Sequence, residues 1–253
     1  MRHNKKSVMA LTVFILLNSS VFADTTLVAV ASNFTRPMTE IATEFEKETG
    51  HTAKLSFSSS SKFVSQIENG APFDVFLSAD DKRPYKLQQS GIAVYGSHVN
   101  YALGKLVLWS STANYIDENG DILSKGDFKH IALADPKLAP YGTAAVEVLT
   151  TKNIFNKLKP LFVLGENISQ AHQFVSTGNA ELGFVALSQV SENGKITRGS
   201  GWIVPQNFYA PMKQDAVLLK TGEENPAAKA LLDYLKSAPA LAIIKKYGYD
   251  LPN

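Results

Sequence analysis

The sequence predicts an α/β protein built as two lobes, and two observations support this fold class. Short runs rich in β-branched and aromatic residues alternate with segments whose apolar residues recur at helical spacing, a pattern typical of sheets covered by helices. Strand-like segments at residues 105–109 and 216–219 lie more than a hundred positions apart. We interpret them as the two passes of a chain that leaves one lobe, builds a second and returns.

The predicted strands are short and recur along the whole chain. Because such runs alternate with helical patterns, we expect them to pair mainly in parallel through helical crossovers. Besides the two passes named above, they fall at residues 26–30, 54–57, 75–77, 131–134, 161–164 and 182–186.

Helical patterns fill the segments between these strands. In the clearest one, Met38, Ile41, Ala42 and Phe45 recur at spacings of three and four, which places them on one face. Gly70 and Gly178 follow two shorter stripes, where glycine commonly ends a helix. The shorter stripes cover residues 63–67, 145–149 and 168–175, and a final helix pair spans residues 226–247.

Composition narrows the classes of function. The chain has 253 residues, of which 45% are hydrophobic and 19% charged, as in ordinary globular proteins. It contains no cysteine, which excludes disulfides, thiolate metal sites, iron–sulfur clusters, a cysteine nucleophile and a lipid anchor through cysteine. Lysine and arginine total 25 against 23 acidic residues, so a broad basic surface for nucleic acid is not expected.

The N-terminus has the pattern of a secretory signal. Arg2, Lys5 and Lys6 precede the apolar run 8–17, and small residues follow at the positions that a signal peptidase reads. A run of ten is well short of the roughly 20 apolar residues that span a bilayer. We therefore predict that residues 1–23 are cleaved after Ala23 and that the mature chain, with 22 basic and 23 acidic residues, works in the periplasm.

Four segments rich in small and polar residues come directly before predicted helices. Strand-to-helix turns of this kind gather at the carboxyl edge of an α/β sheet, where ligands bind. Each helix start presents unpaired N–H groups and the positive end of a dipole, which favours an anion. The alternative is that the polar residues only cap their own helices. The segments are residues 31–33, 58–61, 140–143 and 166–169.

The chemistry of these segments favours a fully ionised oxyanion. They offer hydroxyl and amide donors and contain no lysine or arginine. Molybdate, tungstate and sulfate present only acceptors at neutral pH, whereas phosphate retains a proton and needs an acceptor in the site. The only carboxylate in the segments is Glu166, for which a role in the surface or the turn is favoured.

Characteristic runs lie at residues 28–34, 57–61 and 66–80, and shorter ones follow as far as residue 248. These runs resemble the periplasmic molybdate-binding proteins of ABC importers, and the likeness covers nearly the whole mature chain. The resemblance implies a two-lobed type II, Venus-flytrap binding protein with a hinge and a ligand site in the cleft. It further implies a receptor, not an enzyme, that binds molybdate and tungstate and delivers them to an ABC permease and its ATPase. The matching stretches are residues 28–34, 57–61, 66–80, 134–136, 140–142, 165–168, 183–186, 234–236 and 246–248.

Carried over residue by residue, the resemblance implies a set of oxyanion ligands from four loops. One departure is that many members have a tyrosine where this chain has Ala186, and Tyr141 is a candidate to replace that donor. No cofactor and no bare metal cation are expected, and the chain is expected to be a monomer. The implied ligands are Ser32, Asn33, Ser60, Tyr141 and the backbone N–H of Ile168, with Ser59 and Ser61 in support.

The resemblance and the two strand-like passes also predict where each lobe begins and ends. Residues 24–104 form the first part of lobe 1, residues 105–212 form lobe 2, and residues 213–253 return to lobe 1 and end in helices.

Two other functions stay open. A receptor for sulfate or another tetrahedral oxyanion would share the architecture. A more distant alternative is a serine acylase, because Ser59-x-x-Lys62, Ser191-Glu192-Asn193 and Lys220-Thr221-Gly222 resemble the S-x-x-K, S-D-N and K-T-G set. The spacing of these three motifs is unusual for such enzymes. A metal-binding protein is not favoured, because the histidines lack the spacing of a metal site.

Overall fold

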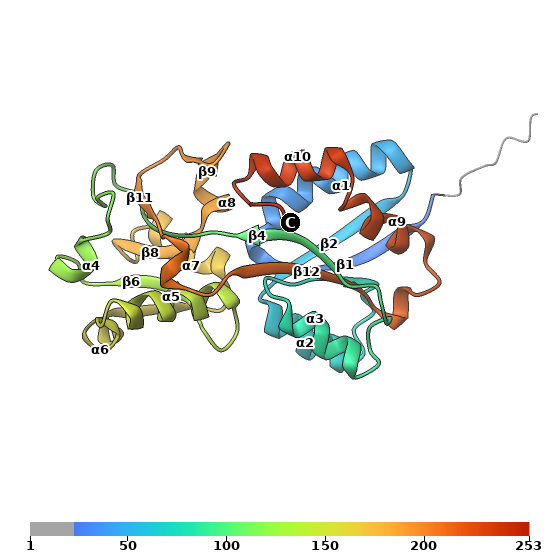
Figure 1. Ribbon diagram of the computed structural model, residues 1–253, viewed down its shortest axis with the longest axis horizontal. Helices are drawn as coiled ribbons and strands as arrows, with labels where there is room; N and C mark the ends of the chain where they lie inside the picture. Colours follow the sequence, from blue (N-terminus) through green and yellow to red (C-terminus); the bar gives the residue numbers. More distant parts are fainter. Residues whose placement is uncertain (1–22, 253) are drawn as a thin grey trace, which may run out of the picture.

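The computed structural model describes residues 23–252, so the predicted export signal lies outside the described residues except for Ala23. Two five-stranded sheets lie side by side along the long axis of the molecule, and each is covered by helices (Figure 1). The predicted α/β class with two lobes is confirmed. No helix within residues 23–252 is both long enough and apolar enough to cross a membrane.

The first sheet combines strands from both ends of the chain, in the order β2-β1-β3-β12-β4. Strands β1, β2 and β3 are parallel, and β12 runs antiparallel to both of its neighbours. Their bounds are β1 Thr25–Ala31, β2 Thr52–Ser58, β3 Val75–Leu77, β4 Val99–Gly104 and β12 Met212–Leu218.

The second sheet is continuous in sequence, with the order β11-β5-β8-β6-β7. Strands β6, β7 and β8 are parallel, whereas β5 and β11 are antiparallel to their neighbours. Their bounds are β5 Leu106–Ser110, β6 Ile131–Ala134, β7 Phe162–Gly165, β8 Leu182–Ala186 and β11 Ser200–Ile203. A small hairpin of β9 (Ser191–Glu192) and β10 (Lys195–Ile196) stands apart.

The chain crosses between the sheets twice, and the two crossings lie next to each other. The first crossing is the single residue Lys105, between β4 and β5. The second runs from the end of β11 through a 3-10 turn, η3 (Gln206–Phe208), to β12. Gly104 pairs with Met212, so the outgoing and returning strands are joined at the boundary. This is the arrangement expected of a hinge.

Helices cover both faces of the first sheet. On one face, the apolar stripe of α1 (Thr35–Thr49) packs with α9 (Pro226–Tyr234) and α10 (Ala238–Lys246) in one core cluster. On the other face, α2 (Ser60–Glu68) and α3 (Lys82–Gln89) build a smaller cluster around Phe63 and Leu87. The 3-10 turns η1 (Ser32–Phe34) and η4 (Lys220–Gly222) adjoin α1 and β12.

The second sheet is covered in the same way. Helix α5 lies against β6 and β8, and α7 packs beside β6, β7 and β8. The helices are α4 Ile122–Lys125, α5 Pro140–Thr151, α6 Phe155–Leu158, α7 Ile168–Ser176 and α8 Leu187–Val190, with the turn η2 Lys159–Leu161. Ala31 and Ala79 of the first half belong to this lobe's core cluster, so the two halves touch through apolar atoms.

Candidate functional site

The predicted helix-start segments meet at a small cavity between the two halves. Its volume is about 10 Å³, counted as the space open to the centre of a water-sized sphere. All five predicted ligands line it, together with Ser59, whereas Ser61 and Ala186 do not. The first half contributes Ala31, Ser32, Asn33, Ser59, Ser60 and Ala79, and the second contributes Ala139, Pro140, Tyr141 and Ile168.

Three helices begin at this cavity. Helix α2 starts at Ser60, α5 at Pro140 and α7 at Ile168. The first N–H groups of a helix have no acceptor within that helix, and no other acceptor in residues 23–252 meets the N–H of Ser60, Tyr141 or Ile168. The cavity is therefore bordered by backbone donors at the positive ends of helix dipoles.

Of the polar residues that precede these helices, one caps its own helix and another lines the cavity without capping. Asn167 is an ordinary N-cap, since its side chain accepts hydrogen bonds from the N–H groups of Ser169 and Gln170. Ser59 precedes α2 but makes no side-chain capping bond. The capping alternative thus holds for Asn167 and fails for Ser59.

Ser60 is held so that its hydroxyl proton stays available. Its Oγ accepts a hydrogen bond from the N–H of Ala79 at 3.1 Å, and the side chain is almost completely buried. A hydroxyl has one proton to donate besides its acceptor sites. With one acceptor site filled, Ser60 can donate that proton to an anion.

Two buried hydroxyls in the cavity wall lack a partner. Among residues 23–252, neither Ser59 Oγ nor Tyr141 OH has a partner within ordinary hydrogen-bond distance, although the hydroxyl of Tyr249 lies near the phenol of Tyr141. An unpaired buried donor costs on the order of 1–3 kcal/mol. An acceptor-rich guest in the cavity would relieve that cost at both positions.

Tyr141 stays protonated at physiological pH. Burial raises the pKa of its phenol well above the ordinary value, and the neighbouring Tyr249 raises it further. The group is therefore a donor that does not become a phenolate near neutrality.

The side-chain amide of Asn33 is bonded within the protein and not directed to the cavity as a free donor. Its side-chain nitrogen donates to Gln214 Oε1 at 2.7 Å and to Tyr249 OH at 2.9 Å, which uses both amide protons. The backbone carbonyl oxygen of Asn33 accepts hydrogen bonds from the hydroxyls of Ser188 and Tyr249. The donor that Asn33 leaves for a ligand is its backbone N–H in the first turn of η1.

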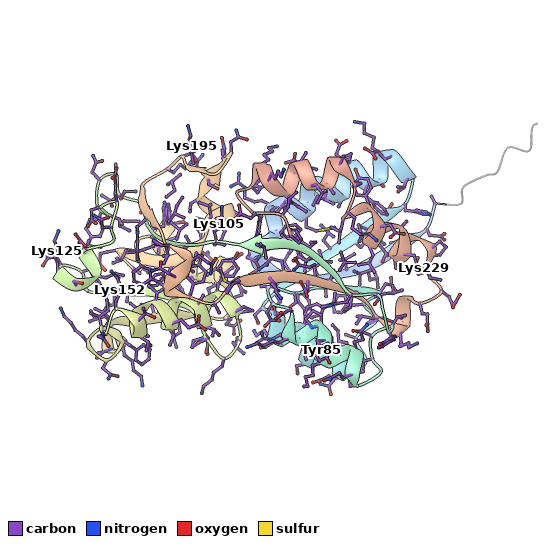
Figure 2. The ribbon with its side chains drawn as sticks, in the orientation of Figure 1. Tyr85, Lys105, Lys125, Lys152, Lys195 and Lys229 are labelled. Atoms are coloured by element: carbon purple, nitrogen blue, oxygen red, sulfur yellow. The ribbon has the colours of Figure 1, made fainter. Side chains whose placement is uncertain are left out.

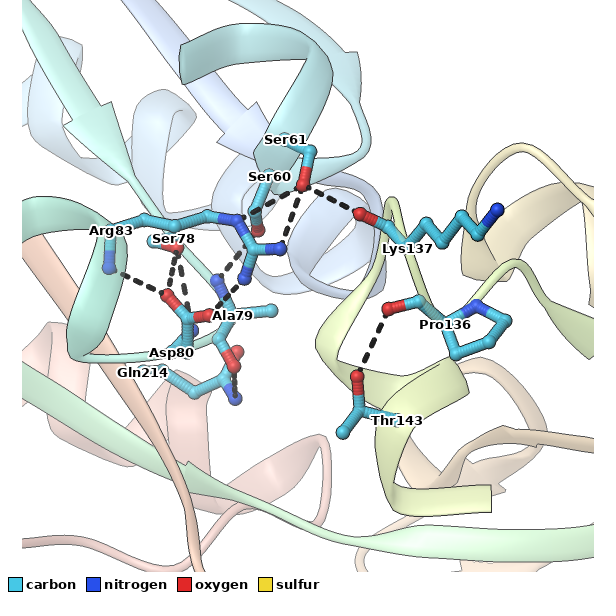
Figure 3. Close-up of polar contacts among 10 residues, drawn as sticks. All are labelled: Ser60, Ser61, Ser78, Ala79, Asp80, Arg83, Pro136, Lys137, Thr143 and Gln214. Atoms are coloured by element: carbon cyan, nitrogen blue, oxygen red, sulfur yellow. Dashed lines mark hydrogen bonds and ion pairs between the residues drawn. The ribbon is translucent and has the colours of Figure 1, made fainter. Parts of the chain in front are cut away.

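Ser61 closes the cleft instead of lining the cavity. Its N–H donates to Leu138 O and its hydroxyl to Lys137 O, both at 3.2 Å and both on the opposite half (Figure 3). The guanidinium of Arg83 donates to the same hydroxyl oxygen. The expected supporting role of Ser61 toward a ligand is therefore replaced, in this structure, by a contact between the halves.

Other contacts across the cleft lie beside the cavity. Ser169 Oγ donates to Ser32 O at 3.2 Å, and Ser188 Oγ donates to Asn33 O at 2.8 Å. Glu166 forms an exposed ion pair with Lys62 at 2.6 Å, in keeping with the surface role favoured for it. The structure thus has its two halves closed on each other.

The site is neutral. Among residues 23–252, no lysine, arginine, aspartate or glutamate lines the cavity. Most of the labelled lysines are spread over the outside of both halves (Figure 2). Lys105, which forms the first crossing, pairs with Asp250 at 2.7 Å. An anion in this cavity would be held by hydrogen-bond donors and not by cations.

The residues of the acylase alternative are not brought together. Lys62 Nζ bonds Glu166 and Lys220 Nζ bonds Glu223, and neither Ser191 nor Lys220 lines the cavity with Ser59. Within residues 23–252, no group of three or more histidines and carboxylates is arranged to hold a metal ion.

Comparisons with known proteins agree with the fold. A family model of bacterial extracellular solute-binding proteins matches residues 26–250. The molybdate-binding protein ModA of Azotobacter vinelandii is 57% identical over 224 residues, covering 88% of this chain and 89% of the relative. ModA of Rhodobacter capsulatus is 55% identical over 223 residues, covering 88% and 87%. The solved structure of the Azotobacter vinelandii periplasmic molybdate-binding protein is similar with a TM-score of 0.87 at 42% identity, covering 90% of this chain and 100% of that one.

The fold, with a small cavity between two lobes, is that of a type II solute receptor. The chain belongs to the family of bacterial extracellular solute-binding proteins.

Proposed function

We propose that this protein is a periplasmic receptor that binds molybdate, and also tungstate, and delivers it to an ABC transporter. The observation that carries the proposal is the pair of unpartnered hydroxyls, Ser59 Oγ and Tyr141 OH, in a neutral cavity bordered by three helix starts. Two relatives at 57% and 55% identity are named molybdate-binding proteins, which supports this ligand.

The proposed ligands come from both halves. Ser32, Asn33 and Ser60 bind from the first half, with Ser59 beside them, and Tyr141 and Ile168 bind from the second. If each of about six charge-assisted hydrogen bonds contributes roughly 1.5–3 kcal/mol, the gross gain is on the order of 10–20 kcal/mol. After association costs of several kcal/mol or more, that gain still permits affinities from micromolar to nanomolar.

We propose that the two halves act as lobes, with residues 24–104 and 213–253 in one and residues 105–212 in the other. An anion that touches both stabilises the closed form, because it binds that form better than the open one. The closed form would then present the surface that the ABC permease, powered by its ATPase, recognises. The receptor acts as a monomer, exported to the periplasm after cleavage behind Ala23, and has no nucleic-acid partner.

The donor-only site predicts a clear order of ligands. Isothermal titration of the mature chain should show tight binding of molybdate and tungstate and little or no binding of phosphate, which brings a proton that the site cannot accept. Tight sulfate binding without molybdate binding would instead support the receptor for other tetrahedral oxyanions.

Affinity should not depend on pH near neutrality. Of the described residues, Tyr141 is the one titratable side chain that lines the cavity, and burial raises its pKa well above the ordinary value, so it keeps its proton near neutrality. The dissociation constant for molybdate should stay constant from about pH 6 to pH 9, since ordinary tyrosines titrate near 10. A steep change around neutral pH would show that an ionisable group holds the anion.

A further inference from the structure

Gln214 is a buried polar residue on the strand that returns to the first half. It lies on β12, two residues after that strand begins at Met212, and its side chain is completely buried. The pairing of β12 with β4 shifts register between Gln214 and Asp215. Such a bulge re-aims side chains and is common beside functional sites.

The Gln214 amide is fully engaged with the loops that form the cavity. Its Oε1 accepts from Asn33 Nδ2 at 2.7 Å. Its Nε2 donates to Ala79 O at 3.2 Å and to Met212 O at 3.1 Å. One side chain therefore ties the first ligand loop, the loop after β3 and the crossing strand together.

The contact with Ala79 extends to Ser60. The N–H of Ala79 donates to Ser60 Oγ at 3.1 Å, while the carbonyl of the same residue accepts from Gln214 (Figure 3). Gln214 thus reaches Asn33 directly and Ser60 through a single residue. The bond from Ala79 decides which way the hydroxyl proton of Ser60 is free to point.

Gly104 lies close both to Gln214 and to Tyr141 of the second half. A Cβ at Gly104, the last residue of β4, would lie 2.5 Å from Tyr141 OH and 2.9 Å from Gln214 Nε2. The lack of a side chain at Gly104 therefore leaves room for both groups. The hinge, Gln214 and the unpartnered phenol are neighbours.

We infer that Gln214 is a positioning residue of the oxyanion site, which holds Asn33 and Ser60 in the orientation that binds the ligand. It does not line the cavity itself and acts through these two residues. The inference rests on the proposed function, because it concerns the same site. Part of the affinity for molybdate would then depend on Gln214, a residue of the strand that returns from the hinge.

The first test replaces Gln214 by methionine, which keeps the length of the side chain and removes its hydrogen bonds. Calorimetry on the mature chain should show molybdate affinity reduced roughly tenfold or more. Ile41→Val is the control, because Ile41 lies in the core of the same half, away from the cavity. That variant should lose thermal stability and keep wild-type affinity. In the double variant Ser60→Ala/Gln214→Met, the losses in affinity should be less than additive, as for residues that act through one another.

The second test uses Gln214→Glu and a pH series. Burial raises the pKa of a carboxyl group, so the new side chain should be neutral at low pH and ionised as the pH rises. The neutral acid keeps one donor and one acceptor and should restore binding, whereas the carboxylate repels the dianion. Affinity should therefore improve as pH falls, over the range in which molybdate stays a dianion. The wild-type profile controls for the titratable groups around this part of the fold, which include Tyr101, Tyr141, Tyr249, Asp80, and Asp215 with its partner His98.

The outcomes separate this inference from the proposed function. If the wild-type chain fails to bind molybdate, the proposed function itself is wrong. If the wild type binds while Gln214→Met has equal affinity, or Gln214→Glu follows the wild-type pH profile, the positioning role is wrong and the receptor function stands. Should Gln214→Met fail to fold, the pH series on Gln214→Glu decides alone.

Discussion

Tyr141→Phe should weaken molybdate binding by about 10- to 100-fold without destabilising the ligand-free protein. The hydroxyl of Tyr141 is buried in the cavity wall and has no partner among residues 23–252. Its removal deletes a hydrogen bond to a charged ligand, for which roughly 1.5–3 kcal/mol is typical. In the ligand-free protein it deletes an unsatisfied donor, so the free energy of unfolding should be unchanged or slightly higher.

Tyr234→Phe is the matched control for this experiment. The hydroxyl of Tyr234 also has no partner within ordinary hydrogen-bond distance in residues 23–252, but it lies on α9 in the core of the first half, where its ring packs against Phe45. Its loss should leave affinity at the wild-type value. Calorimetric affinity and urea unfolding, measured on both variants, give the two quantities. Equal affinity of Tyr141→Phe and wild type would remove the phenol from the set of ligands.

Gly142→Ala should damage both the second lobe and the site. Gly142 is the third residue of α5, and a Cβ there would lie 2.1 Å from the carbonyl oxygen of Ala134, at the end of β6. Because backbone atoms cannot move aside like the end of a flexible side chain, the start of α5 must shift away from the sheet. Overpacking of this kind costs about 1–3 kcal/mol. The shift also carries Tyr141 with it, so affinity should fall roughly tenfold or more.

Thr143→Ala tests whether this effect is local. Thr143 follows Gly142, is exposed, and donates one hydrogen bond to Pro136 O at 3.1 Å (Figure 3). Removing that bond should change the free energy of unfolding by less than about 1 kcal/mol and should leave affinity unchanged. A Gly142→Ala variant with the wild-type free energy of unfolding would show that α5 can move without strain.

Much of the fold could be predicted from periodicity. The strands at residues 75–77, 131–134 and 182–186 have the predicted bounds, and the α1 stripe is buried as expected. Helix α3 was not anticipated because only Pro84 and Leu87 of it are buried, which leaves no apolar stripe. The strands β4 and β11 were missed because each is short and interrupted by glycine and a polar residue, which are Asn100 and Gly104 in β4 and Ser200 and Gly201 in β11. The returning strand begins at Met212, earlier than the predicted residue 216.

The candidate site was predictable where helix starts define it. Backbone donors follow from where helices begin, so the loops at Ser32, Ser60, Tyr141 and Ile168 could be named from the sequence. Side-chain orientation could not be predicted. Successive helical residues point about 100° apart, and Ser61 therefore turns to the opposite half while Ser60 lines the cavity. Gln214 was missed because its inward orientation depends on a bulge that leaves no mark in the sequence.

The uncharged cavity wall has a consequence for the environment in which such a receptor works. Dissolved salt screens attraction between separated charges, with a Debye length of about 8 Å at physiological ionic strength. A receptor that drew in its ligand with lysines and arginines would slow as the surrounding medium became saltier. Short hydrogen bonds inside a closed cavity are exposed to little of that screening. The bound oxyanion should therefore be held almost equally well in fresh and in saline surroundings.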